Sequence, residues 1–284
     1  MPAEPPLVSP RSLTEAYELM ARSAWRPIAG GTDVMVQIAG ELGEPPDGLL
    51  DIWRLDELRG IRVEDGDLVL GALTTYTEIR RSAIVAELLP ALVEASATIG
   101  AAQIQNRGTL GGNIVNASPA GDTLPVLLAS DAEIVLGGPR GERSLPAAAF
   151  WVAYRRTARA DDELVLRVRF PHPALRRVRF RKVGTRRAQA ISKVVLALGW
   201  RKDAGVWRDV RVALGSVADR PIHAVETEGV LEGAAARATV ADHAAAVLSA
   251  EIRPIDDVRS TADYRRVVAG RVRPLVRQRG PPSS

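Results

Sequence analysis

The spacing of apolar residues predicts a mixed series of short elements in the first half of the chain. Ser12 begins a segment with Glu15 three residues later, a capping-box pair, and apolar residues then recur at helical spacing to Ser23. Apolar runs on both sides of Asp65-Gly66 predict a β-hairpin. Residues 84–99 predict core-facing helices that are interrupted at Pro90. Thr77 and Asp122 are expected to cap short helices.

The second half has a run of strands followed by helices. Asp162 to Pro171 alternates apolar and polar residues, which predicts a half-buried strand. Further strands are predicted at 178–183, 191–200 and 210–215, and helices at 224–231, 237–248 and 262–276. Trp207 is expected in the hairpin between the last two strands. This order is typical of an antiparallel sheet with helices on one face, and we place its beginning near 172–177.

One segment of unusual composition, GTLGGNIVNASPAGD, runs from Gly108 to Asp122. It contains four glycines and two asparagines together with Leu110, Ile114 and Val115. A linker would not carry these apolar residues, and a strand would not tolerate two adjacent glycines in its interior. We predict a half-buried loop whose backbone approaches a ligand closely, because glycine has no Cβ and accepts positive φ. The N–H groups of such a loop can receive anionic oxygens.

A second segment of this kind, RPIAGGTDVMVQI, lies earlier in the chain. Ile28-Ala29 is expected to end a short strand, Gly30-Gly31 to turn tightly, and Thr32 to cap a helix with Asp33 in its first turn. A diphosphate would fit at this helix start. The segment is neither a Gly-x-Gly-x-x-Gly fingerprint nor a Walker sequence with its lysine. Either segment alone is better explained as an ordinary tight turn; the presence of both favours an anionic ligand.

Composition sets limits on the function. The chain has 284 residues, 46% of them hydrophobic, enough for two or three domains. There is no cysteine, which excludes disulfides, thiolate catalysis and cysteine-ligated zinc or iron–sulfur clusters in this chain. The three histidines are far apart in sequence, which argues against a metal site.

Charge and hydropathy argue against two classes of partner. The net charge is +4, and the arginines alternate with acidic residues without the basic stripe expected of a nucleic-acid-binding protein. The N-terminus has neither the basic nor the apolar region of a signal peptide, and no run of about eighteen apolar residues could span a membrane. We therefore expect a cytoplasmic protein that binds no nucleic acid.

Further blocks occur in a recognisable order around the two glycine segments. They read LLDIWRLDELRGI, LVLGALTTYTEI, FRKVGTRRAQAISKV, VRVALGSVADRPIHA and TADYRRVV. With AGGTD and TLGGNIVNASPAGD, they resemble the FAD-binding medium subunit of the molybdenum hydroxylases, the family of xanthine dehydrogenase and aerobic carbon monoxide dehydrogenase. The resemblance extends from about Pro10 to Val276.

The resemblance implies an α+β architecture. A two-subdomain FAD-binding fold, of the PCMH type that vanillyl-alcohol oxidase also has, is expected to precede a C-terminal antiparallel sheet with helices on one face. We expect the first subdomain at 1–52, the second at 53–172 and the C-terminal domain at 173–276. The tail, 277–284, is expected to be disordered.

The resemblance also implies which residues hold a non-covalently bound FAD. They are Arg26, Ile28, Ala29, Gly30, Gly31, Thr32, Asp33, Val34, Thr109, Gly112, Asn113, Val115, Asn116, Asp122, Val165 and Lys182. The first segment is expected to wrap the diphosphate, and the second to contact the diphosphate and ribityl chain from the other side. Asp122 is expected to bind the adenosine ribose. Val165 and Lys182 are expected near the isoalloxazine ring, where a lysine suits the negative charge that reduction places around N1 and O2.

By the same resemblance, the chain is the flavin subunit of a larger complex. Electrons would pass from 2Fe-2S clusters in a small subunit to FAD, and then to NAD, a quinone or oxygen, while a large subunit would hold the molybdenum cofactor. This chain would hold no metal and no catalytic acid or base. The family commonly has arginine where this chain has Gln105. The face around Gln105 and the arginine-rich C-terminal helix are candidate contacts with partner subunits.

Three other functions are compatible with parts of the sequence. A stand-alone FAD-dependent oxidase or reductase on the same fold would need acid–base residues around a substrate pocket, and the sequence offers no such group of residues. An interaction module that has lost its flavin conflicts with the intact glycine segments. Nucleic-acid binding is supported by arginine content alone, and its signature would be a linear fall of log affinity with log salt concentration.

Overall fold

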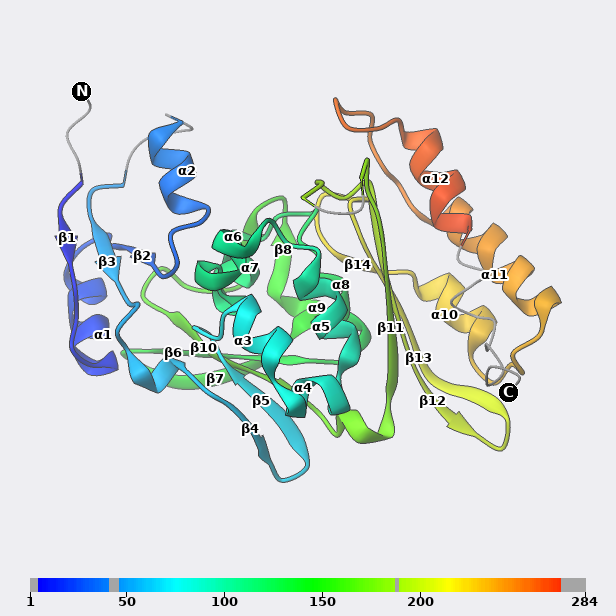
Figure 1. The fold of residues 1–284 in the computed structure, drawn as a ribbon, viewed down its shortest axis with the longest axis horizontal. Coiled ribbons are helices and arrows are strands. Elements are labelled where there is room, and N and C mark those ends of the chain that lie inside the picture. Colours follow the sequence, from blue (N-terminus) through cyan, green and yellow to red (C-terminus); the bar gives the residue numbers. More distant parts are fainter. Residues whose placement is uncertain (1–4, 41–45, 187–188, 272–284) are drawn as a thin grey trace.

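Three β-sheets lie side by side along the long axis of the molecule (Figure 1). This computed structural model describes residues 5–40, 46–186 and 189–271. The tail at 277–284 and the end of the helix predicted at 262–276 lie outside these residues. Within them, no helix is long and apolar enough to cross a membrane.

The first sheet is parallel and small. Its strands, in spatial order, are β1 (Leu7–Val8), β3 (Leu49–Asp51) and β2 (Arg26–Ile28). Helix α1 (Leu13–Arg22) follows β1, and the side chain of Ser12 accepts a hydrogen bond from the backbone N–H of Glu15 as predicted. Helix α2 (Val34–Ala39) follows β2 and has no buried residue. Apolar side chains from this sheet and α1 pack against the second sheet through Leu164 and Leu166.

The second sheet is antiparallel. Its strands, in spatial order, are β4 (Ile61–Glu64), β5 (Asp67–Gly71), β10 (Leu164–Phe170), β6 (Glu133–Gly138) and β7 (Gly141–Pro146). Most of the helices pack on one face: α3 (Tyr76–Arg81), α4 (Ala83–Leu88), α5 (Pro90–Ala97), α6 (Ala102–Arg107), α7 (Leu110–Asn116), α8 (Leu124–Ala129) and α9 (Ala147–Phe150). A separate hairpin joins β8 (Trp151–Ala153) to β9 (Arg156–Thr157). Two 3₁₀ turns are Asp56–Leu58 and Pro173–Leu175.

The third sheet is antiparallel and has helices beyond it. Its strands are β11 (Arg177–Val183), β12 (Val194–Asp203), β13 (Val206–Gly215) and β14 (Ile222–His223). Helices α10 (Val225–Leu231), α11 (Ala238–Glu251) and α12 (Ala262–Gly270) cover one face. On β12, Leu196 and Leu198 point toward these helices, whereas Val195 and Ala197 point into the core shared with the second sheet. The sheet is therefore buried on both faces.

Two local predictions are confirmed, and one predicted helix cap lies at a different residue. The hairpin at Asp65-Gly66 is confirmed, and both residues have positive φ. Pro90 begins α5 as predicted. Thr77 is not a cap; Thr75 caps α3 in a capping box with Glu78.

One prediction about the strands is confirmed and another was wrong. Trp207 lies in the β12–β13 hairpin as predicted, where it is buried and stacks on Trp200 with 5.1 Å between ring centroids. We predicted a half-buried strand at 162–171, but most residues of β10 are buried. Its first residues contact apolar clusters on both sides.

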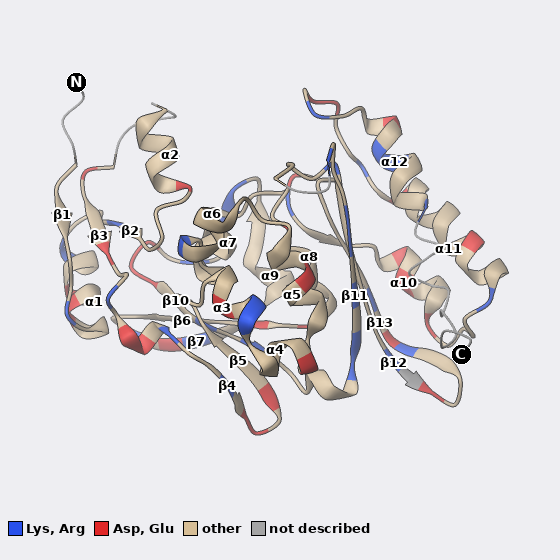
Figure 2. Cartoon of the chain, viewed as in Figure 1, with Lys and Arg blue, Asp and Glu red and all other residues tan. Residues whose placement is uncertain are grey.

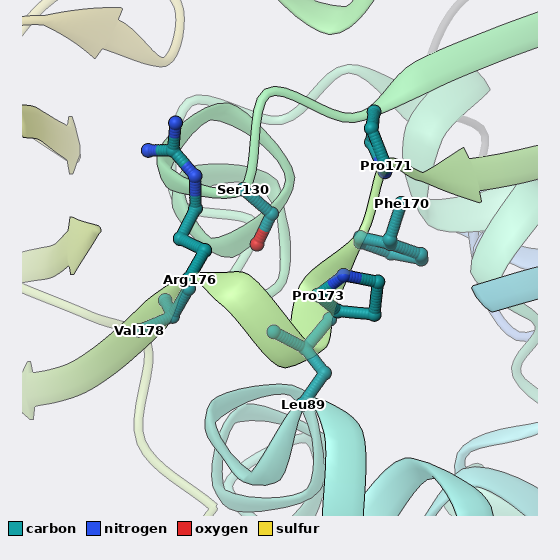
Figure 3. A pocket seen from close by; sticks show the side chains of 7 residues that line it. All are labelled: Leu89, Ser130, Phe170, Pro171, Pro173, Arg176 and Val178. Atoms are coloured by element: carbon teal, nitrogen blue, oxygen red, sulfur yellow. The ribbon is translucent and has the colours of Figure 1, made fainter. Parts of the chain in front are cut away.

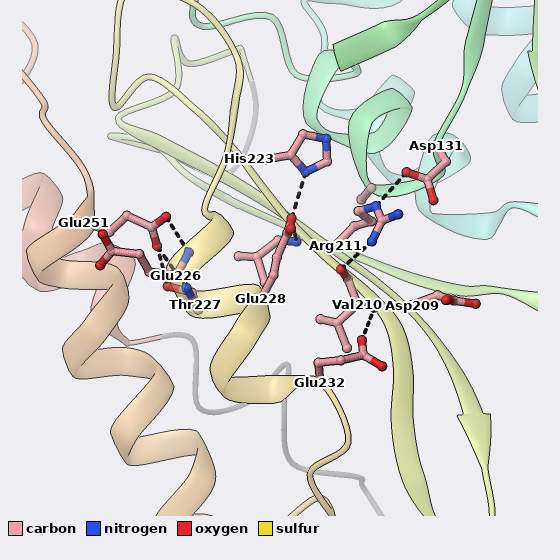
Figure 4. Close-up of polar contacts among 12 residues, drawn as sticks. Asp131, Asp209, Val210, Arg211, His223, Glu226, Thr227, Glu228, Glu232 and Glu251 are labelled. Atoms are coloured by element: carbon pink, nitrogen blue, oxygen red, sulfur yellow. Dashed lines mark hydrogen bonds and ion pairs between the residues drawn. The ribbon is translucent and has the colours of Figure 1, made fainter.

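An ion-pair cluster joins the second and third sheets. Asp131, which follows α8, accepts a hydrogen bond from Arg176 (Nη2 to Oδ2, 2.7 Å). It accepts another from Arg211 (Nε to Oδ1, 2.7 Å) (Figure 4). The Arg176 side chain is only 10% exposed. Nearby, Gly199 is packed so closely on α8 that an ideal Cβ would lie 1.9 Å from the carbonyl oxygen of Ala129. A side chain at Gly199 would therefore push the two layers apart.

Replacing Asp131 with asparagine is expected to lower the free energy of unfolding by about 1–2 kcal/mol, because one charged partner of two arginines is lost. The left-handed backbone at this position (φ 49) suits asparagine, so the cost should come from the contact. Urea unfolding measures it. The control is Asp209→Asn, which breaks a more exposed pair with Arg201 and should cost less than about 0.5 kcal/mol. Equal costs would contradict a special role for Asp131.

Candidate functional site

The structure brings the two glycine segments together. Gly30 lies against the junction of α6 and α7, where an ideal Cβ would be 1.7 Å from the carbonyl oxygen of Arg107. Asn116, at the end of α7, donates a hydrogen bond from Nδ2 to Asp33 Oδ1 (2.9 Å). Residues more than eighty positions apart thus form one surface, between α2 on one side and α6 and α7 on the other (Figure 1).

The second segment is a helix at its centre, not the loop that we predicted. Thr109 caps α7, and its hydroxyl accepts a hydrogen bond from the Gly112 N–H (3.1 Å). Glycine is a poor helix former, but tertiary contacts compensate here. Gly111 packs so closely against Ala72 that its ideal Cβ would lie 2.7 Å from the Ala72 Cβ. The buried face of α7 also contains Ile114.

The opposite face of α7 is open. Its residues are Gly112 and Val115, which are exposed, and Asn113 and Asn116, which are half-buried. An ideal Cβ at Gly112 would meet one atom within 4 Å, the Thr109 hydroxyl oxygen at 2.9 Å. The predicted FAD contacts on α7 therefore lie on the face that is available to a ligand.

The expected free N–H groups occur in the first segment and not in the second. At the start of α7, Leu110 N–H donates to the Thr74 carbonyl (2.9 Å) and Gly111 N–H to the Ala72 carbonyl (2.8 Å). By contrast, no acceptor within the described ranges is recorded for the five N–H groups of residues 30–34. These residues lead into α2, so their N–H groups suit the oxygens of a diphosphate.

The first segment departs from prediction by one residue. Asp33, rather than Thr32, is the N-cap of α2, and its side chain makes no capping hydrogen bond. Burial raises the pKa of Asp33, while the charge of Arg155 and the hydrogen bond from Asn116 oppose this shift. Arg26 bonds to Gln37 Oε1 through Nη2 and thereby ties β2 to α2.

Asp122 and Lys182 form one buried group. Lys182 Nζ lies 2.6 Å from Asp122 Oδ2, and the carboxylate also accepts hydrogen bonds from Ser192 Oγ (2.5 Å) and Thr98 Oγ1 (3.0 Å). Burial raises the pKa of Asp122, and Lys182 and the two hydroxyls oppose the rise. The group joins the second sheet's helices to β11. Asp122 is accordingly not a helix cap; Thr123 is the N-cap of α8.

This pairing concerns two of the predicted site residues. We predicted Asp122 at the adenosine ribose and Lys182 at the isoalloxazine ring, which are separate parts of FAD. In the structure the two side chains are hydrogen-bonded to each other, and both roles stay predictions. The Val165 side chain is buried in the apolar core, and its expected place near the isoalloxazine ring stays a prediction.

Gln105 does not contribute to an exposed face. It is 5% exposed, and its Nε2 donates to the Ile99 carbonyl (3.0 Å) while Arg80 Nη1 donates to its Oε1. The side chain connects α3, α5 and α6 within the chain, while the residues around it, 102–104 and 106–107, are exposed. A partner contact at this face stays a prediction.

One crevice elsewhere in the described chain is less suited to a ligand. A crevice at the start of β11 is lined by Leu89, Ser130, Phe170, Pro171, Pro173, Arg176 and Val178 (Figure 3). It measures about 180 Å³ including open solvent, below the usual range of ligand pockets. No three His, Asp or Glu side chains of the described residues come together to hold a metal ion. Basic and acidic residues are interspersed over the elements (Figure 2).

Sequence reasoning missed several residues around the site. Thr98 and Ser192 are isolated polar residues with no sequence signal, and only the fold brings them to Asp122. Trp151 donates from Nε1 to the carbonyl of Ile114 on α7 (3.0 Å). Arg155, at the tip of the same hairpin, donates from Nη1 to Asn116 Oδ1 (3.2 Å). The turn at 154–155 has no Gly, Asn or Asp, so the sequence offers no hairpin signal that could have drawn attention to either residue.

Known structures share this fold over nearly its whole length. Carbon monoxide dehydrogenase from Hydrogenophaga pseudoflava matches with a TM-score of 0.90 and 32% identity, covering 95% of this chain and 94% of that one. Quinoline 2-oxidoreductase from Pseudomonas putida 86 matches with a TM-score of 0.89 and 26% identity, covering 96% and 95%. The fold and site thus define an FAD-binding subunit.

Sequence comparisons give the family. Residues 3–173 match the family "FAD binding domain in molybdopterin dehydrogenase", and 179–273 match "CO dehydrogenase flavoprotein C-terminal domain". The glyceraldehyde dehydrogenase medium chain of Sulfolobus acidocaldarius is 33% identical over 268 residues, 94% of this chain and 95% of that relative. The chain belongs to the FAD-binding medium subunits of the molybdopterin dehydrogenases, the carbon monoxide dehydrogenase and xanthine dehydrogenase family.

Proposed function

We propose that this chain carries electrons within a larger molybdenum hydroxylase, from iron–sulfur clusters of a partner subunit to an external acceptor. The observation that carries the proposal is the full-length match to medium chains of multi-subunit dehydrogenases, together with the paired glycine segments. FAD supplies the chemistry that this role needs, because it exchanges electrons singly or in pairs. The molybdenum cofactor and the 2Fe-2S clusters are assigned to partner subunits.

The residues fit a non-covalently bound FAD. The N–H groups of residues 30–34 have no acceptor among the described residues, and this segment contacts the end of α7 through Asp33 and Asn116. The absence of cysteine removes one common point of covalent attachment. We assign the diphosphate to the first segment and the open face of α7. We assign Lys182 and Asp122 jointly to the ring end of the cofactor, because an ammonium there would stabilise the charge of the reduced flavin. These positions remain proposals.

The alternative of a stand-alone oxidase or reductase requires catalytic acid–base residues near the flavin. The buried Asp122 carboxylate is fully engaged by three donors, which suits a positioning role better than proton exchange with a substrate. The relatives are medium chains, and this supports the role of a subunit.

We expect the purified chain to show the two visible absorption bands of oxidised flavin, or to acquire them when FAD is added. Anaerobic titration with NADH then tests the acceptor. Bleaching by NADH would indicate NAD as the acceptor, and bleaching by dithionite alone would indicate a quinone, oxygen or another carrier. A chain that remains colourless after incubation with FAD would contradict the proposal.

A further inference from the structure

The hairpin β8–β9 is fixed to the helix that carries the open face. Trp151 is 4% exposed, packs edge-on against Phe150 with 5.6 Å between ring centroids, and donates to the Ile114 carbonyl on α7. The N–H of Ala158 donates to the Phe150 carbonyl (2.8 Å) at the base of the hairpin. Its tip, residues 154–155, is therefore held at a defined place relative to α7.

Arg155 occupies a backbone position that favours glycine. Its φ is 52°, in the left-handed region that non-glycine residues seldom adopt. Residues kept in such conformations occur often at functional sites, and an observed outlier is a reason to look for a function. Glycine would relieve the backbone but would remove the guanidinium.

The guanidinium of Arg155 extends a line of contacts across both glycine segments. It donates to Asn116 Oδ1 (3.2 Å), and Asn116 donates in turn to Asp33 Oδ1 (2.9 Å). Three segments that are far apart in sequence are thereby connected. The Asn116 amide uses its oxygen toward the cation and its nitrogen toward the carboxylate, so the contacts fix its orientation.

The contacts among Arg155, Asn116 and Asp33 also bring opposite charges together. Asp33 places a carboxylate at the start of α2, next to the N–H groups assigned to the diphosphate. An anion at this point would repel the cofactor. Arg155 supplies the compensating positive charge, and its electrostatic effect on Asp33 is the largest that opposes burial.

We propose that Arg155 is a positioning residue for the FAD diphosphate: it holds Asn116 and Asp33 across the two glycine segments and offsets the Asp33 charge. The inference rests on the FAD site proposed above. It predicts that arginine at position 155 strengthens FAD binding, although glycine would suit the positive φ of this position better.

The test is Arg155→Gly in the full chain, freed of FAD and titrated with FAD. We expect the Kd to rise about tenfold or more, as for the loss of one charge-assisted contact, and the increase to shrink at high salt. The urea midpoint of the FAD-free protein should stay unchanged or rise. Arg155→Lys keeps the charge and should recover part of the affinity.

Two controls isolate the cause. Ala204→Gly relieves a similar backbone (φ 45) at the β12–β13 turn and should leave the Kd unchanged. Arg156→Gln removes the adjacent positive charge and should change the Kd less than twofold. A wild-type Kd for Arg155→Gly, or an equal increase for Arg156→Gln, would overturn the inference. A wild-type chain that binds no FAD would instead overturn the proposed function.

Discussion

Gly112→Val is expected to abolish FAD retention while leaving the fold intact. Gly112 lies on the open face of α7, so the valine methyl groups would occupy the space assigned to the cofactor. The backbone itself does not require glycine, because Gly112 is helical and its φ is not positive. The sequence alone suggests that valine would not tolerate the backbone dihedral angles at position 112, but this reason does not apply.

The stability cost of this substitution should be small. The ideal Cβ lies 2.9 Å from the Thr109 hydroxyl oxygen, so the hydroxyl would have to shift and its capping bond would weaken. Loss of such a cap costs about 1 kcal/mol. Flavin absorbance after gel filtration measures retention, and urea unfolding measures stability.

Gly229→Val is the matched control. Gly229 is also an exposed glycine within a helix, and its ideal Cβ has no atom within 4 Å. This variant should retain FAD stoichiometrically. If Gly112→Val also retained stoichiometric flavin, the assignment of the α7 face to the cofactor would be wrong.

Lys182→Met is expected to cost about 3–5 kcal/mol of unfolding free energy near neutral pH, because it leaves the Asp122 carboxylate buried without its cation. Both side chains are well buried, 11% exposed for Lys182 and 6% for Asp122. Two hydroxyl donors remain, but neither carries a charge. In the FAD-loaded protein, the flavin midpoint potential should also fall if Lys182 lies at the ring.

The pH dependence of this variant follows from the raised pKa of Asp122. A carboxyl whose pKa is higher in the folded than in the unfolded state destabilises the fold once it ionises, so stability is lost as pH rises through the folded pKa. Removing Lys182 takes away the largest opposing effect and raises that pKa further. The deficit should therefore be greatest above the folded pKa of Asp122 and should shrink as the pH falls through it.

The measurement is a series of urea unfolding curves for wild type and variant at several pH values. Lys193→Met serves as the control, since the Lys193 ammonium lies 4.7 Å from the centroid of the Tyr264 ring and should contribute about 1 kcal/mol or less. A deficit for Lys182→Met that did not vary with pH would show that Asp122 is not the group responsible.

Local signals in the sequence predicted local structure well. Asp65-Gly66 specifies a hairpin because both residues adopt positive φ, and Pro90 begins a helix because it needs no N–H partner there. The approach of the two glycine segments was also predicted, but from the family resemblance. Nothing local in either segment encodes the contact between Gly30 and Arg107.

Non-local contacts account for the failures. Adjacent glycines at 111 and 112 predict a loop, and α7 forms because Gly111 packs on Ala72 and Thr109 caps it. Asp122 and Lys182 are sixty residues apart, and only the packing of β11 on α5 and α8 brings them together. The edge strand β7 was missed because its residues are mostly polar and exposed.

The third sheet, buried on both faces, has a consequence for how the chain can be divided. Phe180, Val195, Ala197 and Ala213 belong to the same apolar core as the helices that pack on the second sheet. A chain cut between the two family regions would expose the apolar face of the third sheet on one fragment and the helices that cover it on the other. Exposed apolar surface of this kind promotes aggregation. We therefore expect the two family regions to unfold together as one cooperative unit, and a region taken from a relative to need a matching packing surface.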